Sequence, residues 1–537
     1  MLERPTCLLS IIIFLPSVFA ILSLLLPMQK EWIRNLILFS SSLCSLLLAL
    51  FLWNIFDVKN SGFQFSEFHE WIPKWGIAYA IGVDSISLLM VLMTAIVAFI
   101  AFLSTSYNCH NHDHDHDHDH DHNHNHPLPA IKYASAFYAL ILFLQTALYG
   151  TFLATDLFLF YFFWEIALIP MLFIIGIWGG SKRLKVTIKF FIYTLFGSLF
   201  MLIAIIALVA IHKENTGVLS AQYNILKQGQ LAAYFDGSSP MAALSSPQLW
   251  LFLAFTLAFI IKIPIVPFHT WQPDIYEESP LLGAIFISAL LAKMGTYGLL
   301  RFSIGLFAEV SNYISPLMCI LGIVSILYGA LCAWSQISMK RVIAYSSISH
   351  AGYILVGLFT LNAIGMTGGL YQMFNHALLV TGMFLMASYL FERVHTDNIR
   401  EMGGLAKIIP LHSLALFILL LSLIALPGTN SFVGEFSILV GTFNMNIRMA
   451  PLLAFFVALG GIFSALYAFR FYHLIMFGAI YKKEKHKEHR EPFLAFDLKI
   501  KEVLVMGIIA LFILGLGIYP DLFFAKTKIS ITTKVMR

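Results

Sequence analysis

The sequence predicts an all-α polytopic membrane protein with about fourteen transmembrane helices, and three observations carry this prediction. Hydrophobic residues make up 59% of the chain and charged residues 12%, which is about half the charged share of a soluble domain. Apolar runs of membrane length recur from end to end. Two long runs are interrupted by prolines, which favours two inverted five-helix repeats, each with a broken helix.

The apolar runs place the expected helices in order. They predict spans near residues 8–26, 33–53, 81–104, 133–150, 152–178, 187–211, 249–268, 281–302, 313–334, 342–360, 365–391, 411–440, 451–477 and 503–519. The first run has no small-residue cleavage site after it, so we interpret it as a retained span and not as a signal peptide. With the amino terminus outside, the basic loops at 181–189, 335–341 and 481–490 all lie on the cytoplasmic side, as the positive-inside rule requires.

Composition also excludes several classes of function. The net charge is only +4 and the basic residues lie in short connecting loops, so no nucleic-acid partner is expected. The five cysteines are scattered without a C-x-x-C motif, which argues against zinc, iron–sulfur and disulfide frameworks. No glycine-rich fingerprint follows a strand and no Walker motif is present, so no nucleotide or flavin site is expected in this chain.

The first interrupted run, residues 258–269, predicts a transport site. Lys262 is a charge at membrane depth, where it normally faces a partner or a hydrated cavity. Pro264 and Pro267 cannot donate backbone hydrogen bonds, so they leave carbonyls of the preceding turn unpaired beside the lysine. The alternative is a kinked structural helix whose lysine reaches the membrane surface.

Other ionisable residues lie inside predicted spans and favour the transport interpretation. These are Glu165, Lys293, His350, His376 and Glu435, the last of which follows a second break at residues 426–430. A single buried histidine is more often a packing residue, and a single glutamate is as often a structural ion-pair partner. Six titratable residues in separate helices instead favour a route for protons.

We assign each of the six a role in such a route. Glu165 and Lys262 would form a switch, because a lysine paired with a carboxylate holds its proton and releases it when the pair breaks. The residues that pass the proton laterally would be Lys293, His350 and His376, and Glu435 would load or release it at the far end. Moving one charge against the membrane potential costs about 2.3 kcal/mol per 100 mV, so the driving energy must come from outside this chain.

The segment from His110 to His126 alternates histidine with aspartate or asparagine. Imidazole and carboxylate at this density bind Zn²⁺, Ni²⁺ or Cu²⁺. Low-complexity expansion in a tolerant loop explains the segment as well, and no periodic scaffold fixes a coordination geometry. We therefore assign no metal site and keep this loop only as a weak candidate.

The predicted organisation has four parts. Residues 1–132 hold three helices and the histidine-rich loop, and residues 133–304 form the first five-helix repeat. Residues 305–478 form the second repeat, and residues 479–537 hold a basic loop and the last helix. Repeats with an odd number of spans must be inverted relative to one another.

Four motifs together resemble the antiporter-like subunits of respiratory complex I. They are FWEIALIP at 163–170, IKIPIVPFHTWQPD at 261–274, KRVIAYSSISH at 340–350 and LPGTNSFVGEF at 426–436. The resemblance extends over about residues 71–519. Within the family, Glu435 and Asp84, together with the short segment after the last span, resemble the M-type (chain 4) members more than the L or N types.

The resemblance implies a proton-pumping subunit of a bacterial inner-membrane NADH:quinone oxidoreductase, with the six residues above as its functional positions. It also implies that the chain has no redox cofactor of its own, and that NADH, FMN, iron–sulfur clusters and quinone bind to partner subunits. The expected partners are the other membrane subunits of the complex, especially the sister subunits L and N, and the lipid bilayer.

Two alternatives stay open from the sequence. The same lysine and glutamate breaks occur in subunits of multisubunit Na⁺/H⁺ antiporters and membrane-bound hydrogenases. A metal transporter that uses the histidine-rich loop is the third class, and it predicts that deletion of residues 110–126 abolishes transport.

Overall fold

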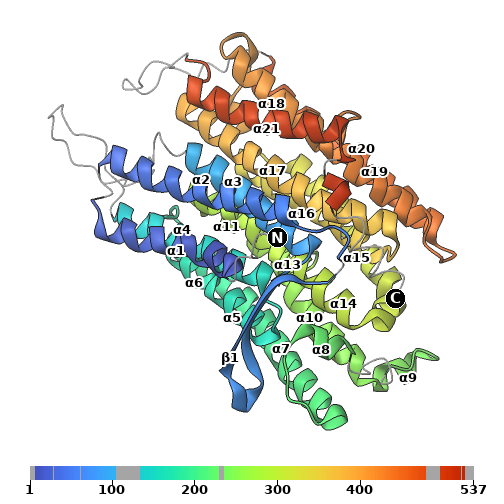
Figure 1. Ribbon diagram of the computed structural model, residues 1–537. Coiled ribbons are helices and arrows are strands. Elements are labelled where there is room, and N and C mark those ends of the chain that lie inside the picture. Colours follow the sequence, from blue (N-terminus) through green and yellow to red (C-terminus); the bar gives the residue numbers. More distant parts are fainter. Residues whose placement is uncertain are drawn as a thin grey trace. The chain divides into compact units, whose positions relative to one another are not determined.

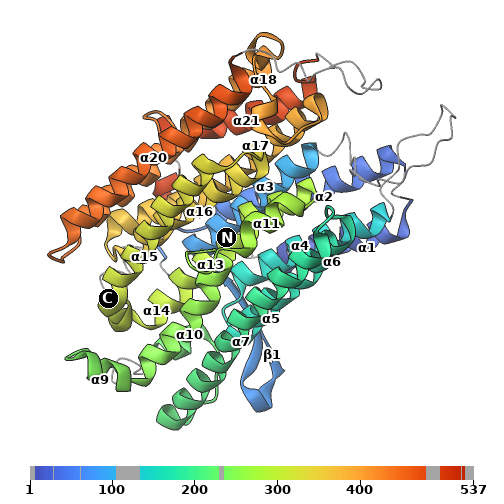
Figure 2. The same cartoon turned by 180° about the vertical axis from the view of Figure 1, so that it is seen from behind.

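The computed structural model describes residues 7–27, 30–60, 62–104, 133–228, 235–478, 496–521 and 523–526 (Figures 1 and 2). These residues are mostly helical, which confirms the predicted fold class. The chain divides into two compact units. The first comprises Met1–Gln230 with Glu277–Ile287, and the second comprises Leu231–Tyr276 with Ser288–Arg537.

Twelve helical segments among the described residues are long and apolar enough to cross a membrane. They match twelve of the predicted spans. The two remaining predicted spans are the interrupted ones, whose helices α10 (Pro247–Lys262) and α18 (Pro410–Leu423) are too short to cross alone. The breaks therefore lie where the prolines predict them, and the total of fourteen spans stays a prediction.

The first unit contains a two-stranded hairpin within a set of apolar helices. Its elements are α1 (Leu8–Leu25), α2 (Glu31–Ile55), β1 (Gln64–Ile72), β2 (Ile77–Val83), α3 (Ser85–Ser104), α4 (Ala134–Leu153), α5 (Leu157–Ile166), α6 (Leu168–Trp178), α7 (Arg183–Thr216) and α8 (Tyr223–Gln228). The hairpin was not predicted, and it corrects the span expected at 81–104, whose first residues belong to β2.

Specific contacts hold the hairpin in place. Gly76 ends the turn of the hairpin with a φ of +67°, a backbone conformation that residues with a side chain rarely adopt. A Cβ at this position would also lie 2.6 Å from the backbone oxygen of Leu219. The carboxylate of Glu67 accepts hydrogen bonds from the backbone N–H groups of Leu9 (2.9 Å) and Ser10 (3.2 Å), at the start of α1. The carboxylate therefore satisfies donors that a helix start leaves unpaired.

The span predicted at 152–178 is one apolar segment, Leu157–Trp178, with a one-residue interruption at Ala167 between α5 and α6. Helix α4 ends at Leu153, and the side chain of Asp156 then caps α5 by accepting from the N–H groups of Phe158 and Leu159. Pro170 removes the hydrogen bond to the carbonyl of Ile166 and its ring crowds that oxygen, so α5 and α6 are separated there. The interruption lies two residues after Glu165, a feature that the sequence analysis did not predict.

The second unit contains most of the interrupted helices. Its further elements are α9 (Pro240–Ser245), α11 (Trp271–Glu278), α13 (Ala292–Gly298), α14 (Ile304–Leu306), α15 (Ala308–Ser335), α16 (Met339–Phe359), α17 (Ala363–Val394), α19 (Asn430–Phe443), α20 (Ala450–Met476) and α21 (Ile500–Ile518). Figure 2 shows α15, α16 and α17 side by side, with α20 along the same group. The segment Leu281–Leu306 contains two π-helical stretches, Phe286–Leu291 and Leu299–Ser303, on either side of α13.

Small residues bring the helices of this unit close together. A Cβ on Gly352 of α16 would lie 2.5 Å from the backbone oxygen of Gly322 on α15. A Cβ on Gly368 of α17 would lie 2.9 Å from the backbone nitrogen of Ile438 on α19. Close backbone contact through glycine is typical of membrane helices, and it fixes the helices that carry His350, His376 and Glu435.

Candidate proton-transfer site

The site begins at the first helix break. Helix α10 ends at Lys262, whose side chain is buried. The carbonyl of Ile261 accepts a hydrogen bond from the indole N–H of Trp271 (3.0 Å), and the carbonyl of Ile260 accepts from the backbone N–H of Ile265 (2.9 Å). The carbonyls of Ile260 and Ile261 are therefore paired within the protein, as the interior of a membrane protein requires. This corrects the expectation that the prolines leave carbonyls of the preceding turn unpaired beside Lys262.

Lys293 lies in the short α13, between the two π-helical stretches. Its side chain is 2% exposed, and its Nζ lies 2.8 Å from the carbonyl oxygen of Ser288 and 2.6 Å from Nδ1 of His376. The wider turns of a π-helix are frequent at functional sites. Here the carbonyl that Lys293 contacts, that of Ser288, lies within the first π stretch, five residues before the lysine.

Two buried histidines extend the series of titratable side chains that begins at Lys293. The rings of His376 on α17 and His350 on α16 have centroids 5.5 Å apart, and Nδ1 of His350 lies 3.1 Å from Oε1 of Glu435 on α19. Both histidines and the glutamate are buried. Four of the six predicted residues therefore form one buried series, which we call the polar chain: Lys293, His376, His350 and Glu435.

Neighbouring amides hold the end of the polar chain at the second helix break. Gln372 donates from Nε2 to Oε1 of Glu435 (3.1 Å), and Asn375 donates from Nδ2 to Oε1 of Gln372 (3.3 Å) and to the backbone oxygen of Asn430 (2.9 Å). Asn430 is the first residue of α19. The amides thus fix both the carboxylate of Glu435 and the helix that carries it.

Sequence reasoning missed these two amides, although a signal was available. Gln372 and Asn375 stand four and one residues before His376 in an otherwise apolar helix. Gln372 shares a helix face with His376, four residues later, and also with Asn375, three residues later. Polar residues on one face of a membrane span are expected to bond to another helix.

A small cavity lies beside Lys293. Its volume is about 10 Å³, the scale of one water molecule. Polar groups from α11, α13, α16 and α17 lie among its walls, which are formed by Ile263, Gln272, Tyr276, Ser288, Ala292, Lys293, Thr296, Ser347, Ala351, Ile354 and His376.

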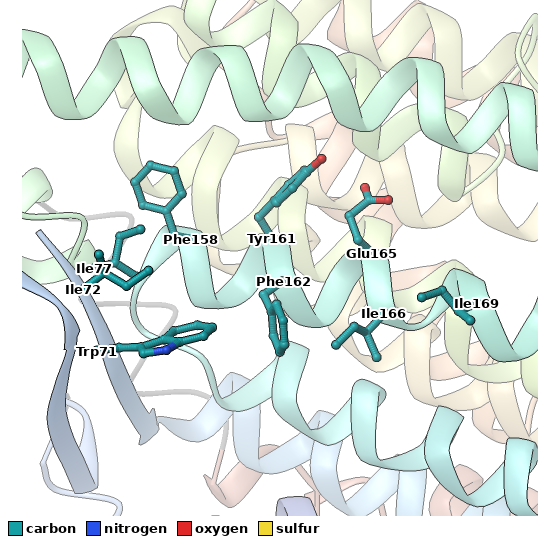
Figure 3. A pocket seen from close by; sticks show the side chains of 9 residues that line it. All are labelled: Trp71, Ile72, Ile77, Phe158, Tyr161, Phe162, Glu165, Ile166 and Ile169. Atoms are coloured by element: carbon teal, nitrogen blue, oxygen red, sulfur yellow. The ribbon is translucent and has the colours of Figure 1, made fainter. Parts of the chain in front are cut away.

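Glu165 has different surroundings in the other unit. It is partly buried and lines an apolar cavity of about 290 Å³ together with residues of the hairpin and of α5 (Figure 3). Figure 3 shows the Tyr161 hydroxyl and the Glu165 carboxylate pointing to the same side of α5. The expected switch joins Glu165 to Lys262, which belongs to the second unit, and this pairing stays a prediction.

The segment from His110 to His126 lies outside the described residues. Within the described part of the chain, no group of three or more histidine, cysteine or acidic side chains is arranged to hold a metal ion. The weak metal candidate of the sequence analysis therefore stays untested.

Interrupted helices and a buried series of titratable side chains define a polytopic membrane protein of the antiporter-like class. The family model described as "NADH:quinone oxidoreductase/Mrp antiporter, TM" matches residues 154–464. The chain therefore belongs to this family.

Individual relatives agree with that membership. The chain is 33% identical over 526 residues to NADH-quinone oxidoreductase subunit M of Rickettsia prowazekii (strain Madrid E), covering 97% of this chain and 96% of the relative. It is 35% identical over 463 residues to subunit M of Escherichia coli (strain K12), covering 85% and 82%. A chain of respiratory complex I from Thermus thermophilus with bound NADH matches with a TM-score of 0.80 and 28% identity, over 98% and 99% of the two chains. The predicted resemblance to M-type subunits is confirmed.

Proposed function

We propose that this chain is a proton-translocating membrane subunit of an NADH:quinone oxidoreductase, and that protons cross part of the membrane along the polar chain. One observation carries the proposal. Lys293 and His376 are in direct contact, the His376 and His350 rings are adjacent, and His350 lies 3.1 Å from Glu435. Charged and titratable groups at such depth are costly to bury, so a connected series of them favours transport over packing.

The chemistry of the transfer follows from the groups in contact. The Lys293 ammonium donates its proton to Nδ1 of His376, which becomes an imidazolium. His376 then releases the proton on Nε2 toward the adjacent His350, directly or through one water, and His350 passes a proton from Nδ1 to the Glu435 carboxylate. Each passage leaves a histidine in its other tautomer, so a ring rotation or a return of the proton resets it.

Glu165 and Lys262 would control the loading of this route. A carboxylate beside a lysine favours the protonated lysine, and separation of the pair would release that proton toward Lys293. Lys262 stands at the carbonyl end of α10, where the helix dipole also favours a cation. The energy for separation would come from quinone reduction in other subunits.

The proposal includes the surroundings of the chain. Its partners would be the other membrane subunits of the complex, including sister subunits L and N, in a bacterial inner membrane. NADH, FMN, iron–sulfur clusters and quinone would be bound by partners, and this chain would supply only the proton route.

A second candidate function is a subunit of a cation/proton antiporter, because the matched family model includes Mrp antiporters. The proteins that co-purify in mild detergent separate the two. Subunits that bind NADH and iron–sulfur clusters support the first function, and a set of small membrane subunits alone supports the second.

The direct experiment replaces Lys293 with methionine and measures NADH-driven proton uptake in membrane vesicles. The proposal expects at least a tenfold loss of uptake with the complex still assembled, since methionine fills similar space but carries no proton. Lys407→Met, on an exposed side chain, is the matched control. Normal uptake in Lys293→Met would reject the proposed route.

A further inference from the structure

Gln272 and Tyr276 lie beside the polar chain and have no role in the route described so far. Both are on α11, one helical turn apart, and both are 1% exposed. Nε2 of Gln272 donates to the Tyr276 hydroxyl (2.6 Å), and Tyr276 shares a further side-chain hydrogen bond with Ser288. Tyr276 therefore fixes the orientation of the Gln272 amide.

The other end of this amide is an unused acceptor. Oε1 of Gln272 is buried and has no hydrogen-bond partner among the described residues. A buried carbonyl oxygen without a hydrogen-bond partner destabilises the fold, so such atoms usually bind an ordered water or ligand.

Lys293 offers the complementary donor. A lysine ammonium carries three N–H groups, and within the described residues Nζ has two hydrogen-bond partners, the carbonyl of Ser288 and Nδ1 of His376. Gln272 and Lys293 line the same cavity, whose volume of about 10 Å³ is the scale of one water molecule. A water there has polar partners on several sides, because Thr296 and Ser347 also line the cavity.

We propose that Gln272, oriented by Tyr276, holds one water molecule against Lys293, and that Gln272 is a positioning residue for proton transfer through this lysine. The water accepts the third N–H of the Lys293 ammonium and donates to Oε1 of Gln272. The inference rests on the proposed function, because it concerns how Lys293 is supplied with its proton.

This water gives Lys293 two hydrogen-bonded neighbours with different roles. His376 takes the proton onward along the polar chain. The water lies in the cavity that Gln272 and Tyr276 also line. Once Lys293 has given its proton to His376, rotation about the Cε–Nζ bond turns the lone pair of the amine toward the water. The water then donates a proton to the amine and accepts in its place the proton that Lys262 releases toward Lys293. Loss of the water would therefore slow the reloading of Lys293 while its contact with His376 remains.

The test uses Gln272→Met, which keeps the side-chain length and removes the acceptor, in vesicles that contain the whole complex. We expect the rate of NADH-driven proton uptake to fall about tenfold, the equivalent of one hydrogen bond to a charged group. We also expect a larger solvent deuterium isotope effect on uptake, which a merely structural defect would not produce. Gln272→Glu, which keeps an oxygen acceptor, should restore most of the uptake.

Controls separate this inference from the proposed function. Ser346→Ala removes a buried hydroxyl that bonds to the Ile343 carbonyl and should leave uptake unchanged. The inference would be overturned if Gln272→Met showed the parental rate of uptake and the parental isotope effect while Lys293→Met lost uptake. That result would still support the proposed function. Normal uptake in Lys293→Met would overturn both. If the complex with Gln272→Met does not assemble, Tyr276→Phe provides the test, because it removes the hydroxyl that orients the Gln272 amide with little change of volume. A larger isotope effect on uptake in Tyr276→Phe supports the inference, and an unchanged isotope effect overturns it.

Discussion

The two helix breaks of the second unit place opposite charges at opposite helix ends. Lys262 is the last residue of α10, where the helix dipole gives the helix end a partial negative charge. Glu435 lies in the second turn of α19, one turn beyond the partially positive amino end, where the dipole acts more weakly than on Lys262. A break therefore does more than bend the helix. It creates a helix end whose dipole stabilises a charged side chain that the membrane interior would otherwise disfavour.

The breaks differ in what completes them. At the Lys262 break the carbonyl of Ile261 is satisfied by the indole of Trp271, the first residue of the next helix in the chain, α11. At the Glu435 break the carbonyl of Asn430 is satisfied from another helix, by Asn375 of α17. The first break is thus held by the helix that follows it directly in the chain, whereas the second is held by α17, the helix that carries His376.

The largest effect is expected from Lys262→Ala. Removing the cation from the carbonyl end of α10 should suppress NADH-driven proton uptake at least tenfold, because the route loses its loading group. The complex should still assemble, since alanine is a good helix former. The measurements are proton uptake in vesicles and the yield of assembled complex. Parental uptake in Lys262→Ala would mean that the proton route does not depend on the residue at the first break.

Glu435→Lys tests whether charge sign matters at the second break. A lysine is titratable, so the route keeps a proton carrier, but it would face His350 and the positive end of α19. We expect a loss of uptake of about three- to tenfold, roughly 1 kcal/mol of unfavourable helix-dipole and charge interaction. Complete loss would show that a carboxylate is required, and full activity would show that the dipole is irrelevant.

Trp271→Phe and Asn375→Leu compare how the two breaks are held. Each removes one donor to a buried carbonyl, which costs about 1–3 kcal/mol. Thermal denaturation in detergent should show destabilisation in both variants. Only Asn375→Leu should also lower proton uptake, because Asn375 bonds to Gln372, which donates to Glu435. Equal uptake in the two variants would contradict the stated difference between the breaks.

The smallest effects are expected from two glycine substitutions. A Cβ on Gly295 would lie 2.8 Å from the backbone oxygen of Phe259 in α10, so Gly295→Ala should destabilise the protein by about 1–3 kcal/mol. A Cβ on Gly434 would lie 2.5 Å from Oε1 of Gln372, the end of a flexible side chain, so Gly434→Ala should cost less. The two melting temperatures measure the difference, and the reverse order would show that α19 is packed more rigidly than α10.

The sequence predicts features whose cause is local. Prolines break α10 and separate α18 from α19 because they lack an N–H group, and this is visible without a structure. The break after Ile166 has the same cause, Pro170, but a single proline in an apolar run does not say whether a helix bends or ends.

Features that depend on several helices were not predictable in the same way. The contact between Lys293 and His376 joins residues 83 positions apart, and the π-helical stretches have no recognised sequence signal here. The hairpin at 64–83 was missed because its strands lie between two membrane spans, where the apolar pattern of β2 merges with that of α3. Only the packing of the chain shows which titratable residues meet.

The central claim is that protons pass through the polar chain, and its middle link gives the most direct test. We would measure protons translocated per NADH oxidised in vesicles with His376→Leu, beside His412→Leu, which replaces another fully buried histidine of the same unit. The account predicts a severe loss in His376→Leu and a nearly parental ratio in His412→Leu. A parental ratio in His376→Leu, with the complex assembled, would contradict it.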